Sequence, residues 1–329
     1  MDSEQDASSY SRKNLLSAEV KSMWNLVKIS KNLCTREQCI RFAEDNGLIL
    51  RSKLCSTHRV PMKVVIKGNI TVGSFRCHRG TCRDKSSISR AKGTWFENAN
   101  LSFPNIYYLM YCYAHHWPQA MVRLENFNEG PVLSSKTITD WYNFCREVVV
   151  SYQIDQQKVI GKIGGKNKVV QIDEIKFGKG KQNKDKSPEN QWLLGLIEDD
   201  SEDLRLEICN DNVRSVEALL PLIKKHVKEG TIIRSDFWDS IDSLTGSGYK
   251  YQKTNYDDTE NPIDNDENYI RRIDSQWRVV KRFYYRDNFK NCTNFADMMV
   301  ECLWRKSISE KHEDPFLKLI EAVKYTYKL

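Results

Sequence analysis

Two regions of the chain carry apolar residues at helical spacing. In residues 12–50 the pattern is set by Val20, Met23 and Val27, which recur three and four positions apart, as on one face of an α-helix. Residues 99–155 contain short apolar segments separated by Pro and Gly breaks. Short helices joined by tight turns resemble a helix-turn-helix arrangement, so this region is predicted to be helical and to bind DNA.

The other parts of the chain have different patterns. Residues 51–98 hold short β-like pieces among Gly, Ser and Cys, too little for a large core of their own. From 165 to 310, apolar runs alternate with amphipathic stretches, which is typical of an α/β fold: a mixed sheet with flanking helices. Strands are expected in KVVQIDEIKFG, QWLLGLIED, LRLEICN, TIIRSD and YKYQKTNY. Residues 1–11 are expected to be a disordered tail, and residues 311–329 a C-terminal helix.

Local signals mark several helix ends. Thr35 is a suitable N-cap with Gln38 three residues later, which is the capping-box pattern. Gly47 is suited to end the same helix. Ser134 or Ser135 can cap a later helix.

Composition and charge exclude some classes of protein. The chain has 329 residues, of which 40% are hydrophobic, and this length favours two or three domains. No run of about 18 apolar residues occurs, and the polar N-terminus lacks the apolar segment of a secretory signal. We therefore expect a soluble, intracellular protein with no membrane partner. The net charge of +7 suits a polyanionic partner.

The cysteines predict a metal site. The chain has ten of them, and without a secretion signal they are expected to be reduced, so spaced pairs are interpreted first as metal ligands. Cys55 with His58 and Cys77 with Cys82 form two pairs in a turn-rich module. This set predicts a zinc ribbon, in which Zn²⁺ replaces the missing core; the alternative is two chance pairs of buried cysteines. The remaining cysteines are interpreted as core residues: Cys34, Cys39, Cys112, Cys145, Cys209, Cys292 and Cys302.

Three acidic residues stand next to segments that are expected to be buried. Asp173 lies within an apolar strand, where an acid is rare unless it is used or paired, and strand alternation puts it on the opposite face from Glu174. Asp236 ends a buried strand, where open α/β sheets place their sites. Asp274 lies beside the apolar stripe of a predicted helix. Each also has an ordinary interpretation, as a strand-end or edge acid, or as a helix N-terminal acid favoured by the macrodipole.

Several segments together resemble a known family. They are SRAKGTWFE, QIDEIKFGKGK, QWLLGLIED, KKHVKEGTIIRSDFW, IDSQWRVVKRF and ECLWRK. In this order and spacing they resemble the Merlin superfamily of DNA transposases and its bacterial insertion-sequence relatives, over residues 45–310. The resemblance implies a ribonuclease-H-like catalytic core with a triad of Asp173, Asp236 and Asp274. In the family the third acid is usually a glutamate, so the side chain of Asp274 is one methylene shorter.

The function implied by this resemblance is that of a DDE/D-type transposase. Such an enzyme binds the terminal inverted repeats of a transposon and catalyses metal-dependent DNA cleavage and strand transfer into target DNA. The triad would hold two Mg²⁺ or Mn²⁺ ions per active site. The implied partners are double-stranded DNA and a second copy in a homodimer, with no small-molecule substrate. The expected location is the nucleus in a eukaryote, and otherwise the cytoplasm with the chromosome.

Basic residues near these segments are candidates for DNA contact. A Gly-containing loop after the first acidic strand and the helix of the third acid are both rich in Lys and Arg, which suits phosphate binding. The candidates are Lys136, Lys176, Lys179, Lys181, Arg278, Lys281 and Arg282, together with Arg123 and Arg146 in the helical region.

Two other functions stay open at the level of sequence. One is a domesticated DNA-binding protein that kept the fold and lost catalysis, which the Asp274 departure allows. The other is a ribonuclease-H-like nuclease that acts on RNA–DNA hybrids, against which the zinc module and the helical region argue.

Overall fold

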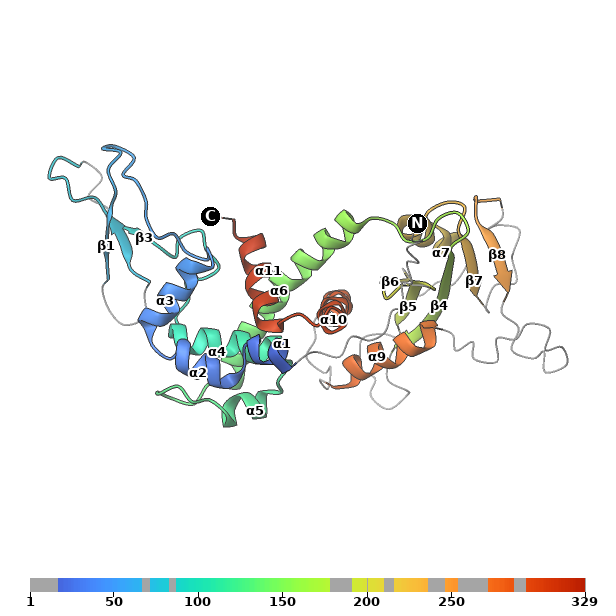
Figure 1. Cartoon of the computed structure of the whole chain (residues 1–329), viewed down its shortest axis with the longest axis horizontal. Helices are drawn as coiled ribbons and strands as arrows, with labels where there is room; N and C mark the ends of the chain where they lie inside the picture. The colour runs from blue at the N-terminus through green and yellow to red at the C-terminus, as the bar shows by residue number, and fades with distance from the viewer. Residues whose placement is uncertain are drawn as a thin grey trace, which may run out of the picture. The chain divides into compact units, whose positions relative to one another are not determined.

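The computed structural model divides the chain into two compact units (Figure 1). The helical unit comprises residues 1–145 and 311–329, and the α/β unit comprises residues 146–310. The residues that the structure describes are 17–66, 72–82, 87–177, 191–199, 201–209, 216–235, 246–253, 272–286 and 294–328.

The helical unit is built around α4, every residue of which except Pro104 is buried. Its helices are α1 (Ser17–Ser22), α2 (Leu26–Asn32), α3 (Arg36–Asp45), α4 (Phe103–Ala114), α5 (Gln119–Leu124), α11 (Pro315–Thr326) and the start of α6 (Ser135–Ile160). Phe42 of α3 and Phe316 of α11 both lie against Tyr107 of α4, with ring centroids 5.3 and 6.4 Å away. The C-terminal helix therefore completes the core of the first unit.

The predicted helix ends are confirmed. The Thr35 side chain accepts a hydrogen bond from the Gln38 amide, and the Gln38 side chain reaches back to the N-cap backbone, so the capping box is complete. Gly47 follows the end of α3 with a φ of +70°, the left-handed conformation that glycine adopts at no steric cost. Ser134 caps α6, because its hydroxyl accepts from the Thr137 amide at 3.0 Å.

A small antiparallel sheet follows α3. It consists of β1 (Lys63–Val65), β2 (Ser74–Arg76) and β3 (Ile88–Ser89), in that order. The buried side chain of Arg90 ties it to the helices, since its guanidinium donates to the carbonyl oxygens of Leu50 and Val72 at 2.8 and 3.2 Å. The same guanidinium forms an ion pair with Glu44 of α3. Hydrogen bonds and an ion pair of Arg90 thus help to anchor the module to the helices.

The α/β unit contains a five-stranded mixed sheet, as the sequence predicts. Its strands are β4 (Val169–Phe177), β5 (Gln191–Glu198), β6 (Leu204–Ile208), β7 (Ile232–Ser235) and β8 (Lys250–Lys253). They lie in the order β6-β5-β4-β7-β8, with β4, β5 and β6 antiparallel and β7 and β8 parallel to β4. The longest strand, β4, is therefore at the centre, with a neighbour on each side.

Helices cover both faces of this sheet (Figure 1). Helix α7 (Val216–His226) packs on one face, and α9 (Arg272–Arg286) and α10 (Phe295–Glu310) pack on the other. Along β4, Val170 and Ile172 belong to the α7 side, whereas Ile175 and Phe177 belong to the α9 side. Because side chains alternate along a strand, Asp173 faces α9. Among the described helices, none combines the length and the apolar character needed to cross a membrane.

Candidate functional site

Asp173 lies in the middle of β4, and α9 packs directly against it. The indole Nε1 of Trp277 donates to Asp173 Oδ2 at 2.8 Å. The same indole covers Gly195, which pairs with Asp173 across β4 and β5. A Cβ on Gly195 would lie 2.7 Å from Trp277 Cη2, a distance that real Cβ contacts do not reach. Glycine at this position therefore lets the helix approach the strand closely enough for the hydrogen bond.

A second hydrogen bond fixes the start of α9. The Ile273 amide donates to Gln171 Oε1 at 3.1 Å, and Gln171 is on the same face of β4 as Asp173. Asp274 is the next residue, in the first turn of α9 and three positions before Trp277. Residues three apart on a helix are neighbours on its surface. The structure thus brings the first turn of α9, which carries Asp274, to the stretch of β4 that carries Asp173.

The third predicted acid, Asp236, lies outside the described residues. The strand before it, β7, ends at Ser235 and pairs with β4 up to Gln171 and Arg234. Parallel strands bring their carboxyl ends to the same edge of a sheet, which is where open α/β sheets place ligands. The described residues thus bring two of the three acid-bearing segments together.

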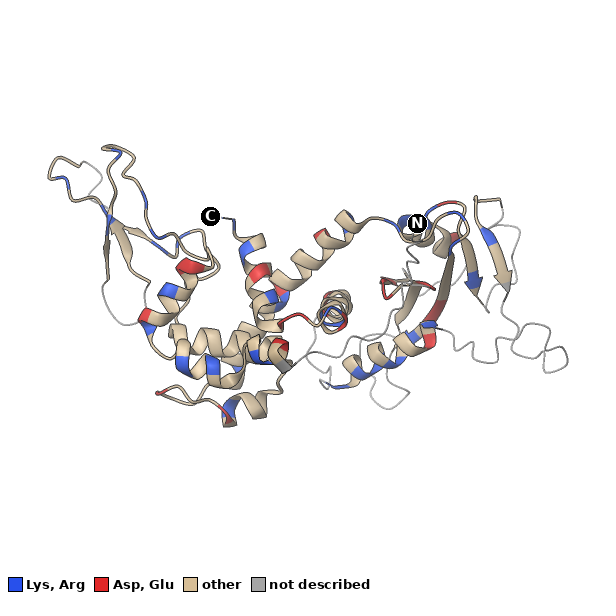
Figure 2. Ribbon diagram, in the orientation of Figure 1, with Lys and Arg blue, Asp and Glu red and all other residues tan. Residues whose placement is uncertain are grey.

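The basic residues predicted to contact DNA lie in several places. Arg278, Lys281 and Arg282 are exposed on α9, and Figure 2 shows several Lys and Arg positions in blue along this helix. Lys136 is exposed and pairs with Asp140 at 2.7 Å. Arg123 is exposed on α5, and Lys179 and Lys181 lie outside the described residues.

Two of the residues predicted to contact DNA, Lys176 and Arg146, contact other groups of the protein. Lys176 lies over the Trp192 ring, 5.7 Å from its centroid, on the face of β4 opposite Asp173. Arg146 pairs with the buried Glu301 at 2.7 Å. Although burial favours the neutral acid, Arg305 and Arg146 hold the pKa of Glu301 down at about 2. Arg146 thus stabilises a buried charge.

The four predicted zinc ligands converge in the helical unit. The ligand atoms of Cys55, His58, Cys77 and Cys82 all lie within 4.8 Å of one another. The sulfur atoms of Cys55 and Cys82 are 3.8 Å apart, far beyond the roughly 2.05 Å of a disulfide. Zn–S bonds of about 2.3 Å in a tetrahedron require sulfur atoms roughly 3.8 Å apart. This Cys₃His group could bind zinc.

Hydrogen bonds prepare this group for a metal. His58 Nδ1 lies 3.7 Å from the sulfur atoms of both Cys55 and Cys77, while Nε2 lies 3.2 Å from the hydroxyl of Thr81. Nδ1 can therefore be the ligand while Nε2–H donates to the hydroxyl, the usual arrangement around metal-bound histidine. Hydrogen bonds from the His58 backbone and then its side chain lower the pKa of Cys55 to about 6, which favours the thiolate that binds metals.

The remaining cysteines were predicted to be core residues. The prediction is confirmed for Cys39, Cys112, Cys145, Cys209 and Cys302, which are buried. It is wrong for Cys34, which is exposed just before the Thr35 cap of α3. Cys292 lies outside the described residues.

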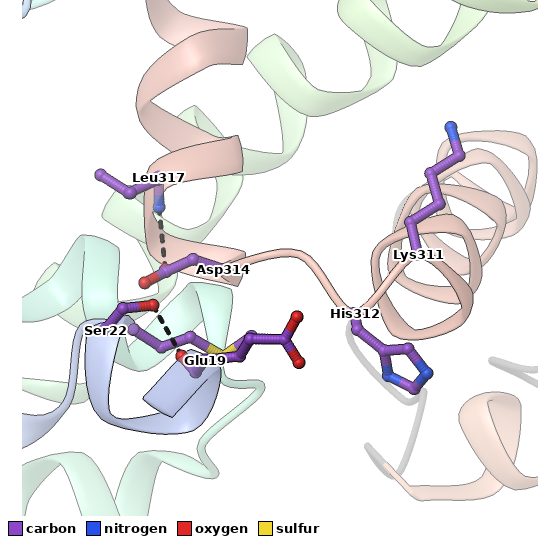
Figure 3. Close-up of a pocket in the computed structure, with 7 residues that line it drawn as sticks. Glu19, Ser22, Lys311, His312, Asp314 and Leu317 are labelled. Carbon is purple, nitrogen blue, oxygen red and sulfur yellow. Dashed lines mark hydrogen bonds between the residues drawn. The ribbon is translucent and has the colours of Figure 1, made fainter. Parts of the chain in front are cut away.

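A pocket of about 290 Å³ opens in the helical unit where α11 begins (Figure 3). Its lining comes from α1 and from the segment before α11. Asp314 accepts hydrogen bonds from the amides of Phe316 and Leu317 at 2.9 and 3.1 Å, and Ser22 donates to the Glu19 carbonyl at 2.6 Å. Asp314 is thus the N-cap of α11, and the pocket adds no ligand to either site.

Three residues near the two candidate sites were not identified from the sequence. Gly195 is a glycine inside a strand, which points to a close approach of another element, and this signal could have been used. Gln171 is buried beside Asp173, but nothing local distinguishes it from other polar residues in strands. The role of Thr81 depends on the folded position of His58.

One comparison with known proteins gives a relative. Over 99 residues the chain is 31% identical to an uncharacterized transposase-like protein of Haemophilus influenzae. The similarity covers 30% of this chain and 77% of that protein. No family model matches the chain.

Proposed function

The chain belongs to the family of transposase-like proteins, and from this premise we propose that it is a DDE/D-type DNA transposase. In this proposal the α/β unit is a ribonuclease-H-like catalytic core of the kind found in the Merlin superfamily. It cleaves DNA at the terminal inverted repeats of a transposon and joins the ends to target DNA. The mixed sheet with helices on both faces supports this assignment.

The observation that carries the proposal is the approach of α9 to β4. Trp277 donates to Asp173, and the Ile273 amide donates to Gln171. These bonds bring the first turn of α9, which carries Asp274, to the stretch of β4 that carries Asp173, 101 positions earlier in the chain. If Asp274 were only a helix N-terminal acid and Asp173 only a strand-edge acid, nothing would require their two segments to lie together. The proposed triad is Asp173, Asp236 and Asp274.

The residues present fit hard divalent cations. Mg²⁺ and Mn²⁺ prefer carboxylate oxygens, and each ionised carboxylate has about four acceptor positions. Asp173 accepts from the Trp277 indole and from the Glu174 amide, which keeps the carboxylate oxygens in a fixed orientation. A bound pair of such ions would activate water or a DNA 3′-hydroxyl and stabilise the leaving oxygen. Trp277 keeps the Asp173 carboxylate in one orientation.

The exposed basic face of α9 suits the DNA backbone. Arg278, Lys281 and Arg282 are exposed on the helix that also carries Asp274. A backbone held there by phosphate contacts would run past the acids. In the helical unit, Cys55, His58, Cys77 and Cys82 would hold Zn²⁺ and keep the small sheet folded, while α4 to α6 read the transposon ends as part of a homodimer.

The alternative, that Asp274 is only a helix N-terminal acid, can be tested with two matched variants. Asp274 is the acid in the first turn of α9, and Asp297 is the acid in the first turn of α10. Terminal-repeat DNA would be incubated with wild type, Asp274→Asn and Asp297→Asn in Mg²⁺, and cleavage and strand transfer measured. We expect Asp274→Asn to lower cleavage by at least about 100-fold and Asp297→Asn to leave it unchanged, because removal of a charge-stabilising group costs about 10²–10³ in rate.

The same experiment includes Asp173→Ala and Asp236→Ala. Equal cleavage by these variants and by wild type would reject the proposed site. Binding of terminal-repeat DNA by wild type without cleavage would instead favour the domesticated DNA-binding protein.

A further inference from the structure

A network of polar groups, buried at its centre and half-buried or exposed toward its ends, connects β4, the start of α9 and the end of β7. Its centre is Gln171, which is 3% exposed. Gln171 Oε1 accepts from the Ile273 amide at 3.1 Å, and Gln171 Nε2 donates to Asp199 at the end of β5. One side chain thus joins β4, α9 and the segment after β5.

The network continues from Asp199 into β7 and β8. Arg234 Nη1 donates to Asp199 Oδ2 at 3.0 Å, and the same guanidinium donates to Gln252 Oε1 at 3.1 and 3.3 Å. Arg272, the first residue of α9, donates to the backbone carbonyl of Asp199 at 2.7 Å. Asp199 therefore binds both the strand before Asp236 and the start of the helix that carries Asp274.

The residues of this network lie at short, regular distances in sequence from the proposed acids. Gln171 is two residues before Asp173, and Arg234 is two residues before Asp236. The amide that Gln171 binds belongs to Ile273, which directly precedes Asp274. Each hydrogen bond of the network thus involves a residue within two positions of a proposed metal ligand.

The chemistry of the Gln171 carboxamide makes the connection directional. Its oxygen accepts from one of the helix amides that lack an intrahelical partner, while its nitrogen donates to a carboxylate. A reversed amide would place its oxygen against the Asp199 carboxylate and its nitrogen against the Ile273 amide. Buried polar groups that are only partly satisfied are costly, so this arrangement holds the first turn of α9 in one place.

We infer that Gln171, Asp199 and Arg234 are positioning residues. They hold β4, the start of α9 and the end of β7 together and so set the spacing of the Asp173 and Asp274 carboxylates for divalent cations. This inference depends on the proposed function. Carboxylates held close enough to share cations repel one another before the cations bind. A rigid connection between their three segments offsets that repulsion, whereas a loose one would let the segments separate.

Exchanging the partners gives a sharp test. Gln171→Glu still accepts from the Ile273 amide but faces Asp199 with a second carboxylate. Asp199→Asn loses the charge that binds Arg234. In the double variant, the glutamate introduced at position 171 accepts from the Ile273 amide and from the side-chain amide of the asparagine introduced at position 199. The oxygen of that asparagine accepts from Arg234. Connectivity and net charge are thereby restored.

The measurements use the full-length, zinc-loaded protein. Mn²⁺ binding is measured by calorimetry and the Mg²⁺ dependence of cleavage by kinetics. Hydrogen exchange of the Ile273 amide is followed in protein free of Mg²⁺ and Mn²⁺. We expect each single variant to raise the half-saturating Mn²⁺ concentration about tenfold, the lower end of effects at groups around a metal site. Gln171→Glu should also speed exchange of the Ile273 amide, and the double variant should return affinity to within about threefold of wild type.

A matched control separates positioning from general stability. Asp203 pairs with the buried Arg205 at 2.7 Å near the same edge of the sheet, outside this network, so Asp203→Asn should lower the melting temperature without changing Mn²⁺ affinity. The inference is overturned if the folded single variants bind Mn²⁺ as wild type does, or if the double variant binds as weakly as the two changes combined. If Asp173→Asn also leaves Mn²⁺ binding and cleavage unchanged, the proposed function fails as well.

Discussion

The contact between Gly195 and Trp277 gives a quantitative test of how α9 sits on the sheet. A methyl group at residue 195 would lie 2.7 and 2.8 Å from two atoms of the Trp277 ring and 3.1 Å from Ile273 Cδ1. The indole belongs to a buried core and is itself bound to Asp173, so it cannot move away without losing contacts. Overpacking of this kind costs about 1–3 kcal/mol. Gly195→Ala should therefore lower the stability of the α/β unit by that amount.

A double-mutant cycle isolates the contact. Trp277→Phe removes the outer ring atoms that the new methyl group would meet, along with the hydrogen bond to Asp173. In this background Gly195→Ala should cost about 1 kcal/mol less than in wild type, within the usual range for residues in contact. The stability of this unit is measured from hydrogen exchange of the β4 and β5 amides at increasing urea concentrations. Gly80→Ala, where a Cβ meets nothing within 4 Å, is the control for adding a methyl group.

Additive effects in this cycle, or a Gly195→Ala variant as stable as wild type, would contradict the proposed contact. Either result would mean that α9 does not lie on Gly195, and the approach of Asp274 to Asp173 would lose its structural basis. The cleavage rate of Gly195→Ala should fall together with the stability, because displacing the indole also frees the Asp173 carboxylate.

Three further predictions concern other parts of the chain. Removing Zn²⁺ with a chelator should speed hydrogen exchange throughout the small sheet while the α/β unit stays protected, since zinc replaces a core there; unchanged exchange would contradict the metal site. Glu301→Gln should cost about 3–5 kcal/mol at pH 7, because it leaves Arg146 and Arg305 without a buried counter-charge. The pKa of Glu301 is lowered from 4.5 to about 2, so the stability that its charge contributes is present above about pH 4.5 and is lost as the pH falls toward 2. Urea unfolding should therefore give a smaller stability difference between wild type and Glu301→Gln at pH 2.5 than at pH 7, and the same difference at both pH values would contradict this. Arg90→Met should make the small sheet more sensitive to proteolysis, because the variant loses the hydrogen bonds to Leu50 and Val72 and the ion pair with Glu44. Sensitivity equal to that of wild type would show that Arg90 is not needed to hold the sheet in place.

Much of the local structure could be predicted because its causes are local. Strand alternation placed Asp173 on one face of β4, and the capping pair of Thr35 and Gln38 marked the start of α3. The Cys₃His group followed from ligand type and spacing, since cysteine and histidine pairs in a short turn-rich module have few other uses. In each case the deciding residues are within a few positions of one another.

Long-range pairing accounts for what the sequence left open. Phe316 completes the core around Tyr107 although the α/β unit lies between them in the chain, and no periodicity reports that return. The pairing of Arg146 with Glu301 spans 155 positions, so Arg146 could not be distinguished from a DNA-binding residue. Lys176 was grouped with basic residues beside the acids, but strand alternation puts it on the other face. Cys34 was interpreted as a core residue because it lies near Cys39 and a predicted helix, but it is exposed just before α3.

A crystal structure of the full chain soaked in Mn²⁺, with anomalous scattering used to locate the metal, would test directly whether Asp173 and Asp274 share a cation site. We predict manganese bound directly to carboxylate oxygens of both Asp173 and Asp274, beside the indole of Trp277. Manganese elsewhere only, or Asp173 and Asp274 in separate places with no ion between them, would contradict it.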